Sequence, residues 1–508
     1  MSSVLERFSP ATREWFAGAF VEPTPAQLGA WDAISSGAHA LVVAPTGSGK
    51  TLAAFLWAID RLVGQGEGDS SVAHKTTVLY ISPLKALGVD VERNLRAPLV
   101  GVTQTAKRLG LPTPNVTVGV RSGDTTAQDR RMLARLPPDI LITTPESLYL
   151  MLTSAARETL TSVDTVIIDE VHAVAASKRG AHLAVSLERL DGLLARPAQR
   201  IGLSATVRPL EEVARFLGGR ASVTIVHPPA TKTFDLSVVV PVDDMSAPGL
   251  TAQASAESGG QTTGASIWPH VEESIVDRIL EHRSTIVFAN SRRLAERLTA
   301  RLNEIYQERT FPEMVSSAVD RVSRGSAGIF GRAEPVDSGG PPTSPGLLAR
   351  AHHGSVSKEQ RATIEDDLKT GVLRCVVATS SLELGIDMGA VDLVIQVESP
   401  PSVASGLQRI GRGGHQVGEI SKGVLFPKHR TDLLHVTVAV ERMLSGQIES
   451  IAVPSNPLDV LAQQTVAAVA LDTLDVEEWF DTVRRSAPFS ILPRSAFDAT
   501  LDLLSGLY

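Results

Sequence analysis

The sequence has little cysteine, few aromatic residues and no long apolar run. A single cysteine, Cys375, in 508 residues excludes a disulfide framework and a zinc site built on cysteines, and it suits a reducing compartment. No uninterrupted apolar stretch approaches the roughly 18 residues that span a bilayer. Residues 1–10 lack the basic and apolar segments of a signal peptide. The sequence therefore predicts a soluble, cytoplasmic protein with no membrane partner.

An excess of basic residues is also absent. Lys and Arg number 48 against 56 Asp and Glu, a formal net charge of −8, which argues against a surface coated with cations for nucleic acid. The hydrophobic content of 43% is that of a globular protein with a core. At about 150 residues per domain, the length predicts two to four domains.

Short apolar runs recur through the first part of the chain, separated by stretches with helical spacing. The runs rich in β-branched residues are 41–43, 78–81, 140–142, 166–168 and 201–203. Between the first two, Leu52, Phe55, Leu56 and Ile59 have the i, i+3, i+4, i+7 spacing of a helix with one apolar face. This alternation predicts a doubly wound α/β domain with a parallel sheet over residues 1–233, whose ligand lies at the carboxyl ends of the strands.

A second set of apolar runs follows a stretch rich in Ser and Gly at residues 243–266, which predicts a flexible loop. These runs are 286–288, 375–377, 393–395 and 424–426. They predict a second parallel-sheet α/β domain over residues 234–447. Residues from about 309 to 346 contain Gly-Gly-Pro-Pro and Ser-Pro-Gly, so we expect a flexible insertion there.

Residues 448–508 have helical spacing and no further strand-like runs. Asn456 before Pro457 predicts the start of one helix, and Asp475 with Glu478 resembles the capping box of a second. We expect Ser495 to open a third helix. The apolar face of the first helix is predicted to contain Leu458, Leu461, Thr465 and Val469. Three short helices predict a winged-helix or helix-turn-helix module, and we expect it to be partial because the sequence stops at Tyr508.

The strongest motif is Ala-Pro-Thr-Gly-Ser-Gly-Lys-Thr at residues 44–51, between a predicted strand and a predicted helix. In such a loop Lys50 reaches the β- and γ-phosphates of a nucleotide, and the Thr51 hydroxyl holds Mg²⁺. The residues whose backbone is expected to surround the phosphates are Thr46, Gly47, Ser48 and Gly49. A chance glycine-rich turn is the alternative, and the flanking strand and helix argue against it.

A phosphate loop needs a metal-binding acid on a neighbouring strand, and Asp169 follows the apolar run 166–168. Asp169 is expected to hold Mg²⁺ through water, and Glu170 to orient the attacking water as a base. Because adjacent residues of a strand point to opposite faces, both can serve only if the strand ends before them.

These motifs resemble those of superfamily 2 helicases of the DExH kind. The resemblance rests on Asp-Glu-Val-His at 169–172, Ser-Ala-Thr at 204–206 and the phosphate loop, and it extends over residues 23–430. It implies two RecA-like domains that bind ATP and Mg²⁺, with Gln27 of the segment 23–27 contacting adenine. It also implies nucleic-acid contacts in the segments 82–87, 121–125 and 143–147, at Pro83, Lys85, Arg121, Gly123, Thr143 and Thr144.

The second domain carries further segments of the same kind. Residues 378–389 resemble motif V, which implies that Gly385 and Asp387 face the nucleotide and that Thr379 contacts a nucleic-acid phosphate. His353, in the His-His-Gly-Ser segment at 352–355, is implied as another nucleic-acid contact. A metal site at the paired histidines is the alternative, and a third nearby ligand is missing from the sequence.

Residues 408–415 resemble motif VI, which implies that Arg412 is the arginine finger and Arg409 a lesser candidate. His415 stands where the commoner pattern has a second arginine, which puts a mechanism with two fingers in question. Four features together resemble the large helicase-related (Lhr) family: His415, Gln408, Asp-Glu-Val-His and the helical segment 456–464.

The resemblance implies an ATP-dependent 3′→5′ translocase that acts on single-stranded DNA and unwinds DNA or DNA:RNA duplexes. An RNA helicase or a duplex remodeller is one alternative. An ATP-gated clamp that binds nucleic acid and recruits a partner is another. The sequence gives no indication of oligomeric state.

Overall fold

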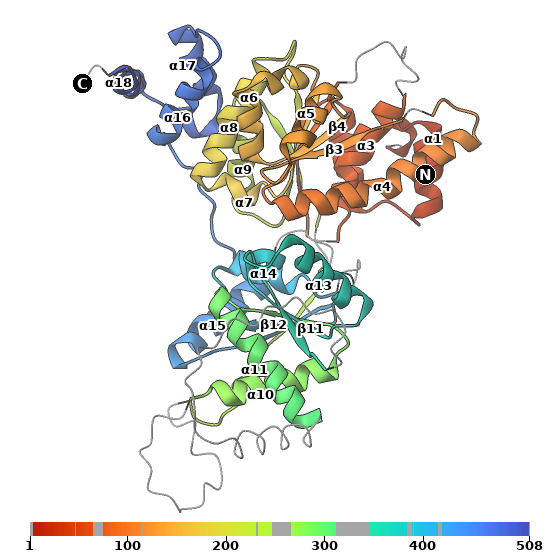
Figure 1. The fold of residues 1–508 in the computed structure, drawn as a ribbon, viewed down its shortest axis with the longest axis vertical. Coiled ribbons are helices and arrows are strands. Elements are labelled where there is room, and N and C mark those ends of the chain that lie inside the picture. Colours follow the sequence, from red (N-terminus) through yellow and green to blue (C-terminus); the bar gives the residue numbers. More distant parts are fainter. Residues whose placement is uncertain are drawn as a thin grey trace, which may run out of the picture. The chain divides into compact units, whose positions relative to one another are not determined.

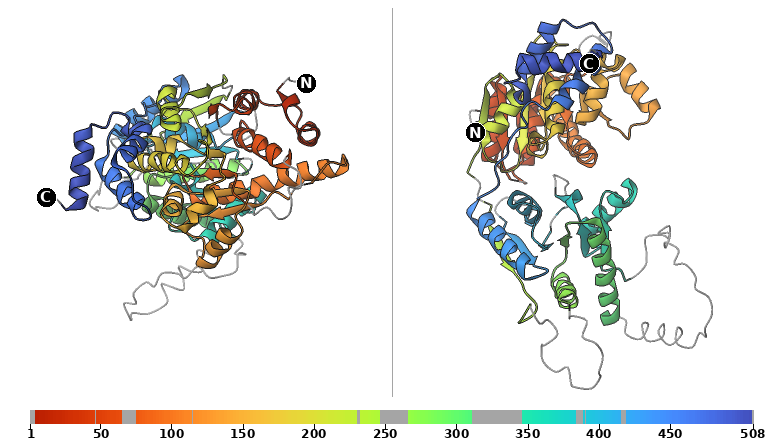
Figure 2. Two further views of the ribbon diagram at one scale, coloured as in Figure 1. Left: turned by 90° about the horizontal axis from the view of Figure 1, so that it is seen from above. Right: turned by 90° about the vertical axis from the view of Figure 1, so that its left-hand side faces the viewer.

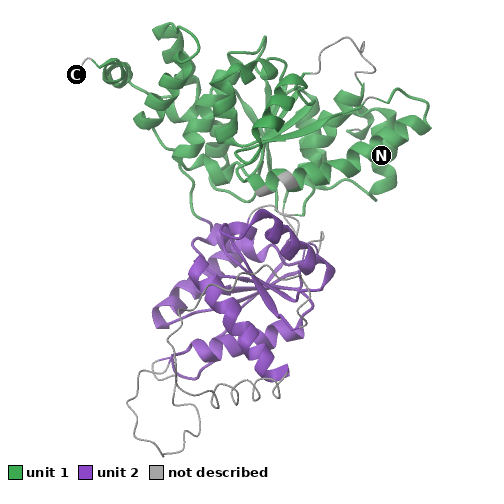
Figure 3. Cartoon of the chain, in the orientation of Figure 1, with its two compact units in different colours: residues 1–231, 449–508 green, residues 232–448 purple. Residues whose placement is uncertain are grey.

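The computed structural model describes residues 4–45, 47–64, 75–113, 115–229, 232–245, 266–310, 346–383, 389, 391–414 and 419–506. The chain forms two compact units (Figure 3). Unit 1 comprises Met1–Thr231 and Glu449–Tyr508, and unit 2 comprises Lys232–Ile448. Each unit is built on its own parallel sheet (Figures 1 and 2). None of the described helices is long and apolar enough to cross a membrane.

The sheet of unit 1 has the described strand order β3-β4-β2-β5-β6-β1-β7, and every pairing is parallel. Its strands are β1 His39–Val43, β2 Val78–Ile81, β3 Val118–Arg121, β4 Ile140–Thr143, β5 Thr165–Ile168, β6 Gln199–Ser204 and β7 Val223–Val226. Its helices are α1 Pro10–Ala19, α2 Pro25–Ser35, α3 Lys50–Gly64, α4 Lys85–Arg108, α5 Ala127–Arg135, α6 Pro145–Leu152, α7 His172–Ala175, α8 Lys178–Asp191 and α9 Leu210–Gly218.

Helices cover both faces of this sheet because successive strand residues point to opposite sides. In β1, Ala40 and Val42 pack against α2 and α3, whereas Leu41 and Val43 lie in the core on the side of α8 and α9. The doubly wound domain expected from the sequence is confirmed, including all five predicted strands. The sequence patterns missed β3 and β7, because β3 is only half-buried and contains Gly119, and β7 has a single buried residue, Val226.

Unit 2 has the described strand order β10-β11-β9-β12-β13-β8, again with every pairing parallel. Its strands are β8 Phe234–Val238, β9 Thr285–Phe288, β10 Ala349–His352, β11 Cys375–Ala378, β12 Leu393–Val397 and β13 Ser421–Phe426. Its helices are α10 Trp268–Glu281, α11 Arg292–Thr310, α13 Lys358–Thr370, α14 Val403–Ile410 and α15 Arg430–Ser445. The second parallel sheet is confirmed, and the edge strands β8 and β10 were missed because neither has a continuous apolar run. Most of the expected insertion lies outside the described residues.

The C-terminal helices, blue in Figure 1, belong to unit 1 and pack on α8. They are α16 Leu458–Val469, α17 Val476–Arg485 and α18 Arg494–Ser505. Ala181 and Val185 of α8 lie in one core with Leu461, Val483 and Phe497 of these helices. Helix α8 therefore has one face in the core of the sheet domain and another in the core of the C-terminal module.

Three local predictions for this module were wrong. Asn456 has a left-handed φ of 48° and does not cap α16, whose N-cap position is Pro457. Ser495 lies inside the first turn of α18, which begins at Arg494. Leu458 and Val469 are exposed, because the buried face of α16 is rotated toward α8. The cap at Asp475 is confirmed, since its carboxylate accepts the N–H groups of Glu477 and Glu478.

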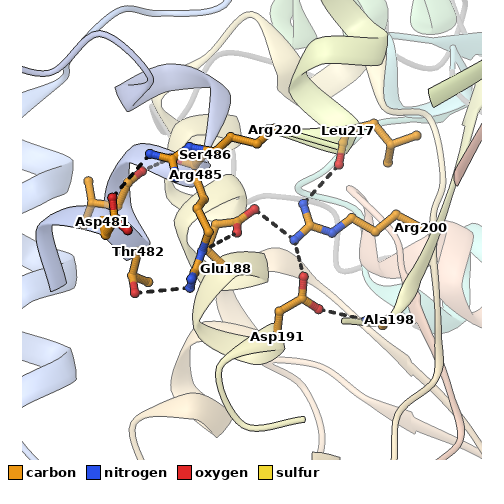
Figure 4. Close-up of polar contacts among 11 residues, drawn as sticks. Glu188, Asp191, Ala198, Arg200, Leu217, Arg220, Asp481, Thr482, Arg485 and Ser486 are labelled. Atoms are coloured by element: carbon orange, nitrogen blue, oxygen red, sulfur yellow. Dashed lines mark hydrogen bonds and ion pairs between the residues drawn. The ribbon is translucent and has the colours of Figure 1, made fainter. Parts of the chain in front are cut away.

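A buried polar network joins α8 to β6 and to the C-terminal module (Figure 4). Arg200 of β6 pairs with Glu188 at 2.9 Å and with Asp191 at 2.6 Å, and its guanidinium also donates to the Leu217 carbonyl. On its other side, Glu188 pairs with Arg485 of α17 at 3.3 Å. The two carboxylates, Glu188 and Asp191, thus balance the two arginines, Arg200 and Arg485. Loss of any one of the four would leave one charge uncompensated.

Gly219 permits this close packing, and we predict that Gly219→Ala detaches the C-terminal module. Gly219 has a φ of 60°, and a Cβ there would lie 2.5 Å from the Arg485 carbonyl oxygen. We expect a loss of about 2–4 kcal/mol in the free energy of unfolding, from backbone strain plus the displaced α17. Urea denaturation monitored by tryptophan fluorescence, to which Trp479 in the module core contributes as one of five tryptophans, measures it.

Gly110→Ala, in the same unit, is the matched control. Gly110 also has a positive φ, of 67°, but a Cβ there would meet nothing within 4 Å. This variant should lose only about 1 kcal/mol, the cost of the left-handed backbone. Equal losses in the two variants would contradict the steric argument.

Candidate active site

The phosphate loop connects β1 to α3 at the carboxyl edge of the sheet. Gly47 and Gly49 have left-handed φ values of 83° and 75°, which turn the chain into the first turn of α3. Lys50 is the first residue of α3 and is only 6% exposed, and its Nζ donates to the Ala44 carbonyl at 3.1 Å. Thr51 follows in the same turn. Thr46, expected in this loop, lies outside the described residues.

Helix α2 supports the loop through Thr24 and Gln27. The two residues form a capping box, in which Thr24 N–H donates to Gln27 Oε1 at 2.9 Å and Gln27 N–H donates to the Thr24 hydroxyl. The Thr24 hydroxyl also donates to the Ser48 carbonyl at 2.8 Å. A Cβ on Gly49 would lie 2.5 Å from Gln27 Nε2, so the glycine also permits this approach. Gln27, predicted to contact adenine, is therefore packed directly against the phosphate loop.

Asp169 and Glu170 lie just beyond β5, which ends at Ile168, as both roles required. Asp169 is 3% exposed, accepts a hydrogen bond from the Tyr80 hydroxyl, and accepts the Glu170 N–H at 2.9 Å. Burial and the adjacent Glu170 charge raise the pKa of Asp169 to about 7, against the opposing effects of Tyr80 and Lys50. The buried carboxylate therefore needs a nearby cation to be stable in its ionised form.

Glu170 has a φ of 43°, a left-handed conformation that is strained for this residue type. His172 Nδ1 lies 3.5 Å from Glu170 Oε2 and 3.1 Å from the Ser204 hydroxyl. Ser204 also accepts the Ala44 N–H through its carbonyl at 3.1 Å. The expectation that β1 and β5 are neighbours was wrong: β6 lies between them, and Ser204 at its end contacts both the phosphate-loop strand and the Asp-Glu-Val-His turn.

The donor set fits a magnesium ion. Mg²⁺ prefers oxygen ligands and is commonly held by one or two carboxylates together with nucleotide phosphates. Asp169 supplies a buried carboxylate whose ionisation a cation would favour, and Thr51 supplies a hydroxyl at the start of α3. The described residues contain no cluster of three His, Cys, Asp or Glu side chains suited to a metal held by protein alone.

The predicted nucleic-acid contacts of unit 1 lie at the ends of β2, β3 and β4, the carboxyl edge that also carries the phosphate loop. Lys85 at the start of α4 pairs with Asp124 at 2.5 Å, and both side chains are exposed. The Thr143 hydroxyl donates to the Arg121 carbonyl at 2.8 Å, and Thr144 caps α6. Pro83 is buried at the end of β2, and the Gly123 carbonyl accepts from Arg130.

In unit 2 the two candidate arginines are both 2% exposed, and both contact Glu383. Arg409 pairs with the Glu383 carboxylate at 3.0 Å, donates to Asn290 and Gln396, and lies over the Phe288 ring. Arg412 donates to the Glu383 backbone carbonyl at 3.0 Å. Both side chains are thus held inside unit 2, so these contacts do not separate the two candidates, and Arg412 stays the finger predicted from motif VI.

His353 and Thr379 lie at the ends of β10 and β11. His353 is 5% exposed and its Nε2 contacts Glu296, while the neighbouring His352 contacts Ser381 and Glu365. Thr379 is half-buried, and its N–H donates to the His352 carbonyl. Gly385, Asp387 and His415 lie outside the described residues.

Two supporting residues were missed by the sequence patterns. Tyr80 lies in an apolar run that predicts a buried strand, and a phenol in such a run signals a buried hydrogen-bond partner, here Asp169. Glu383 lies in the segment that resembles motif V, and nothing in the local sequence indicates that it contacts two arginines 26 and 29 residues away.

The buried charge of Asp169 should make the stability of the folded protein depend on pH. Because the folded pKa of about 7 lies above the ordinary value of 3.8, the folded protein loses stability as the pH rises through this range. We expect Asp169→Asn, with Mg²⁺ removed by chelation, to be more stable than the parent at pH 8 by at least about 1 kcal/mol, or roughly 2–4 °C. Thermal unfolding at pH 5 should show a smaller difference.

Asp124→Asn, at an exposed position of the same unit, is the control and should leave the pH dependence unchanged. An Asp169→Asn protein that is less stable than the parent at pH 8 would contradict the buried-charge argument.

Three family descriptions match the chain. "DEAD/DEAH box helicase" matches residues 24–214, "Helicase conserved C-terminal domain" matches 342–416, and "Large helicase-related protein, winged helix domain" matches 441–508. The three matches follow the order of the phosphate-loop domain, the second sheet domain and the C-terminal helices.

Relatives with this organisation occur in bacteria and archaea. The Lhr helicase/probable uracil glycosylase of Mycolicibacterium smegmatis is 68% identical over 99% of this chain, which spans 32% of that relative. The Lhr helicase/uracil glycosylase of Escherichia coli is 60% identical, with 99% of this chain and 32% of the relative covered. The ATP-dependent helicase Lhr-Core of Saccharolobus solfataricus is 38% identical over 98% of this chain and 51% of the relative. The chain thus spans between a third and half of these relatives.

Solved structures agree with the sequence matches. The structure of Mycobacterium smegmatis helicase Lhr bound to ssDNA and AMP-PNP matches with a TM-score of 0.84 and 66% identity, over 99% of this chain and 58% of that one. The DUF1998 helicase MrfA matches with a TM-score of 0.68 at 21% identity, over 92% of this chain and 56% of that one, and shows a shared fold. The two sheet domains are RecA-like, and the chain belongs to the large helicase-related (Lhr) family.

Proposed function

We propose that this chain is the motor of an ATP-dependent DNA helicase that moves 3′→5′ along single-stranded DNA and unwinds DNA or DNA:RNA duplexes. The observation that carries the proposal is the convergence of Lys50, Asp169 and Glu170 at the carboxyl edge of one sheet. A relative of 66% identity holds single-stranded DNA and AMP-PNP, which supports nucleotide and strand binding here.

The residues of unit 1 divide the work of hydrolysis. Lys50 neutralises the β- and γ-phosphates above the start of α3, where the helix dipole favours anions. Asp169 and Thr51 would hold Mg²⁺, which neutralises charge on the phosphates when bound. Glu170 orients and deprotonates the attacking water from a strained backbone position just beyond the end of β5. Gln27 would select adenine beside the loop it supports.

In unit 2 we propose Arg412 as the arginine finger. Gly385 and Asp387 are proposed nucleotide contacts by family resemblance. The nucleic-acid contacts proposed in both units are strand-end hydroxyls, backbone groups and single cations, which bind phosphates without reading bases. Work in the cytoplasm is proposed because the chain has a single cysteine, Cys375, which suits a reducing compartment.

Glu170→Gln should abolish hydrolysis while leaving ATP binding intact. The amide keeps the size of the side chain but cannot accept the proton of the attacking water, so we expect kcat to fall by about 10²–10⁴-fold. Phosphate release in the presence of single-stranded DNA gives kcat, and equilibrium titration with a fluorescent ATP analogue gives the affinity.

Glu211→Gln, at an exposed position of α9, is the matched control and should hydrolyse ATP at the parent rate. Hydrolysis by Glu170→Gln at the parent rate would overturn the assignment of the base.

Directional unwinding should require a 3′ tail. We expect the chain to displace strands from duplexes of DNA and of DNA:RNA that carry a 3′ single-stranded DNA tail, and to leave 5′-tailed and blunt duplexes intact. A gel-based displacement assay with ATP measures this, and the Glu170→Gln variant is the control for ATP dependence.

The other outcomes separate the alternatives. Displacement from a 5′ tail alone would contradict the polarity. Hydrolysis stimulated mainly by RNA or by duplex DNA would favour an RNA helicase or a remodeller. Stimulated hydrolysis without displacement from either tail would favour a clamp.

A further inference from the structure

Lys232 is the first residue of unit 2 and lies beside the segment that carries Arg412. Its Nζ donates a hydrogen bond of 2.7 Å to the Gly411 carbonyl, 179 residues further along the chain. Gly411 is the C-cap residue of α14, so its carbonyl is among those left without an intrahelical partner. A lysine at this end also opposes the negative pole of the helix dipole.

The contact fixes one end of the peptide plane between Gly411 and Arg412. The other end is fixed as well, because the Arg412 N–H donates to the Arg409 carbonyl at 3.1 Å. A peptide unit is planar, so holding its oxygen and its nitrogen fixes the N–Cα bond of Arg412 and limits the directions in which its side chain leaves the backbone. Arg409 is itself held by Glu383, Asn290 and Gln396, which makes it a firm base for this plane.

The position of Lys232 is costly, which argues that it is more than a solvated surface lysine. Burial, and then the neighbouring Arg412, lower the pKa of Lys232 to about 8, against the opposing charge of Glu419. A lysine placed only for solubility would turn its ammonium to water and away from another cation. Here the ammonium remains on a backbone carbonyl next to Arg412.

We propose that Lys232 is a positioning residue for ATP hydrolysis, which acts by orienting the Gly411–Arg412 peptide and so the arginine finger. The inference rests on the proposed role of Arg412. Because Lys232 is the residue at which the chain enters unit 2 from unit 1, it joins this entry point to the arginine-finger segment.

The test is a double-mutant cycle between Lys232→Met and Arg412→Ala, measured as kcat and KM for ATP at saturating single-stranded DNA. Arg412→Ala alone should lower kcat by about 10³-fold or more. Lys232→Met alone should lower kcat by roughly 10- to 100-fold, the effect of a misplaced catalytic group, with KM unchanged. In the Arg412→Ala background Lys232→Met should cause no further loss beyond about 2-fold, because it acts through Arg412.

Lys422→Met removes an exposed lysine from β13 of the same unit and should leave kcat unchanged. Lys232→Arg, which keeps a charged donor, should retain most of the activity. If Lys232→Met unfolds, Lys232→Gln supplies the same comparison with a neutral donor.

If Lys232→Met lowers kcat by the same factor in the parent and in the Arg412→Ala protein, the positioning role is wrong and the finger assignment still stands. Parent-like hydrolysis by Arg412→Ala would instead contradict the proposed function of Arg412, and this inference would fall with it.

Discussion

Two carboxylates buried side by side, Asp169 and Glu170, are the feature on which the rest of unit 1 depends. Burial in a place with little water makes each charge costly, and the second charge increases the cost of the first. The structure limits this cost with Lys50, the Tyr80 hydroxyl and the Glu170 N–H. A cation that binds here would lower the cost of the two negative charges. A nucleotide with its bound metal ion brings such a cation together with its phosphates.

Helix α8, the second helix after these acids, connects the sheet of unit 1 to the C-terminal module. Helix α8 carries Glu188 toward Arg200 and Arg485, and it places His182 and Ser186 against Gln464 of α16, which is 0% exposed. The Gln464 amide donates to both, and its oxygen accepts from Arg189 at 2.9 Å. A fully hydrogen-bonded buried amide specifies one docked arrangement. The C-terminal helices are therefore an integral part of unit 1, although the whole of unit 2 separates them from it in sequence.

The sequence predicts most of this fold because buried parallel strands are continuous apolar runs, as in residues 166–168 and 393–395. It fails at the edge strands β3 and β10, because β3 is only half-buried and β10, Ala-Arg-Ala-His, has no continuous apolar run. The phosphate loop and Asp169 could be found from local motifs. Tyr80, Glu383 and Lys232 could not, because their roles come from contacts between segments far apart in the chain, and the relevant spacing exists only after folding.

The net charge of −8 does not conflict with the proposed strand-binding motor, because Lys85, a cation proposed to contact phosphates, already has an acidic partner in Asp124. Arg179 of α8 pairs in the same way with Glu146 at the start of α6. Exposed pairs of this kind contribute only about 0–1 kcal/mol each, so a phosphate can replace the acid at little cost. The acid also competes for the cation afterwards, which weakens each phosphate contact. A motor that must release every phosphate it binds is better served by such shared cations than by a uniformly basic groove, whose many contacts would add to an affinity too high for movement.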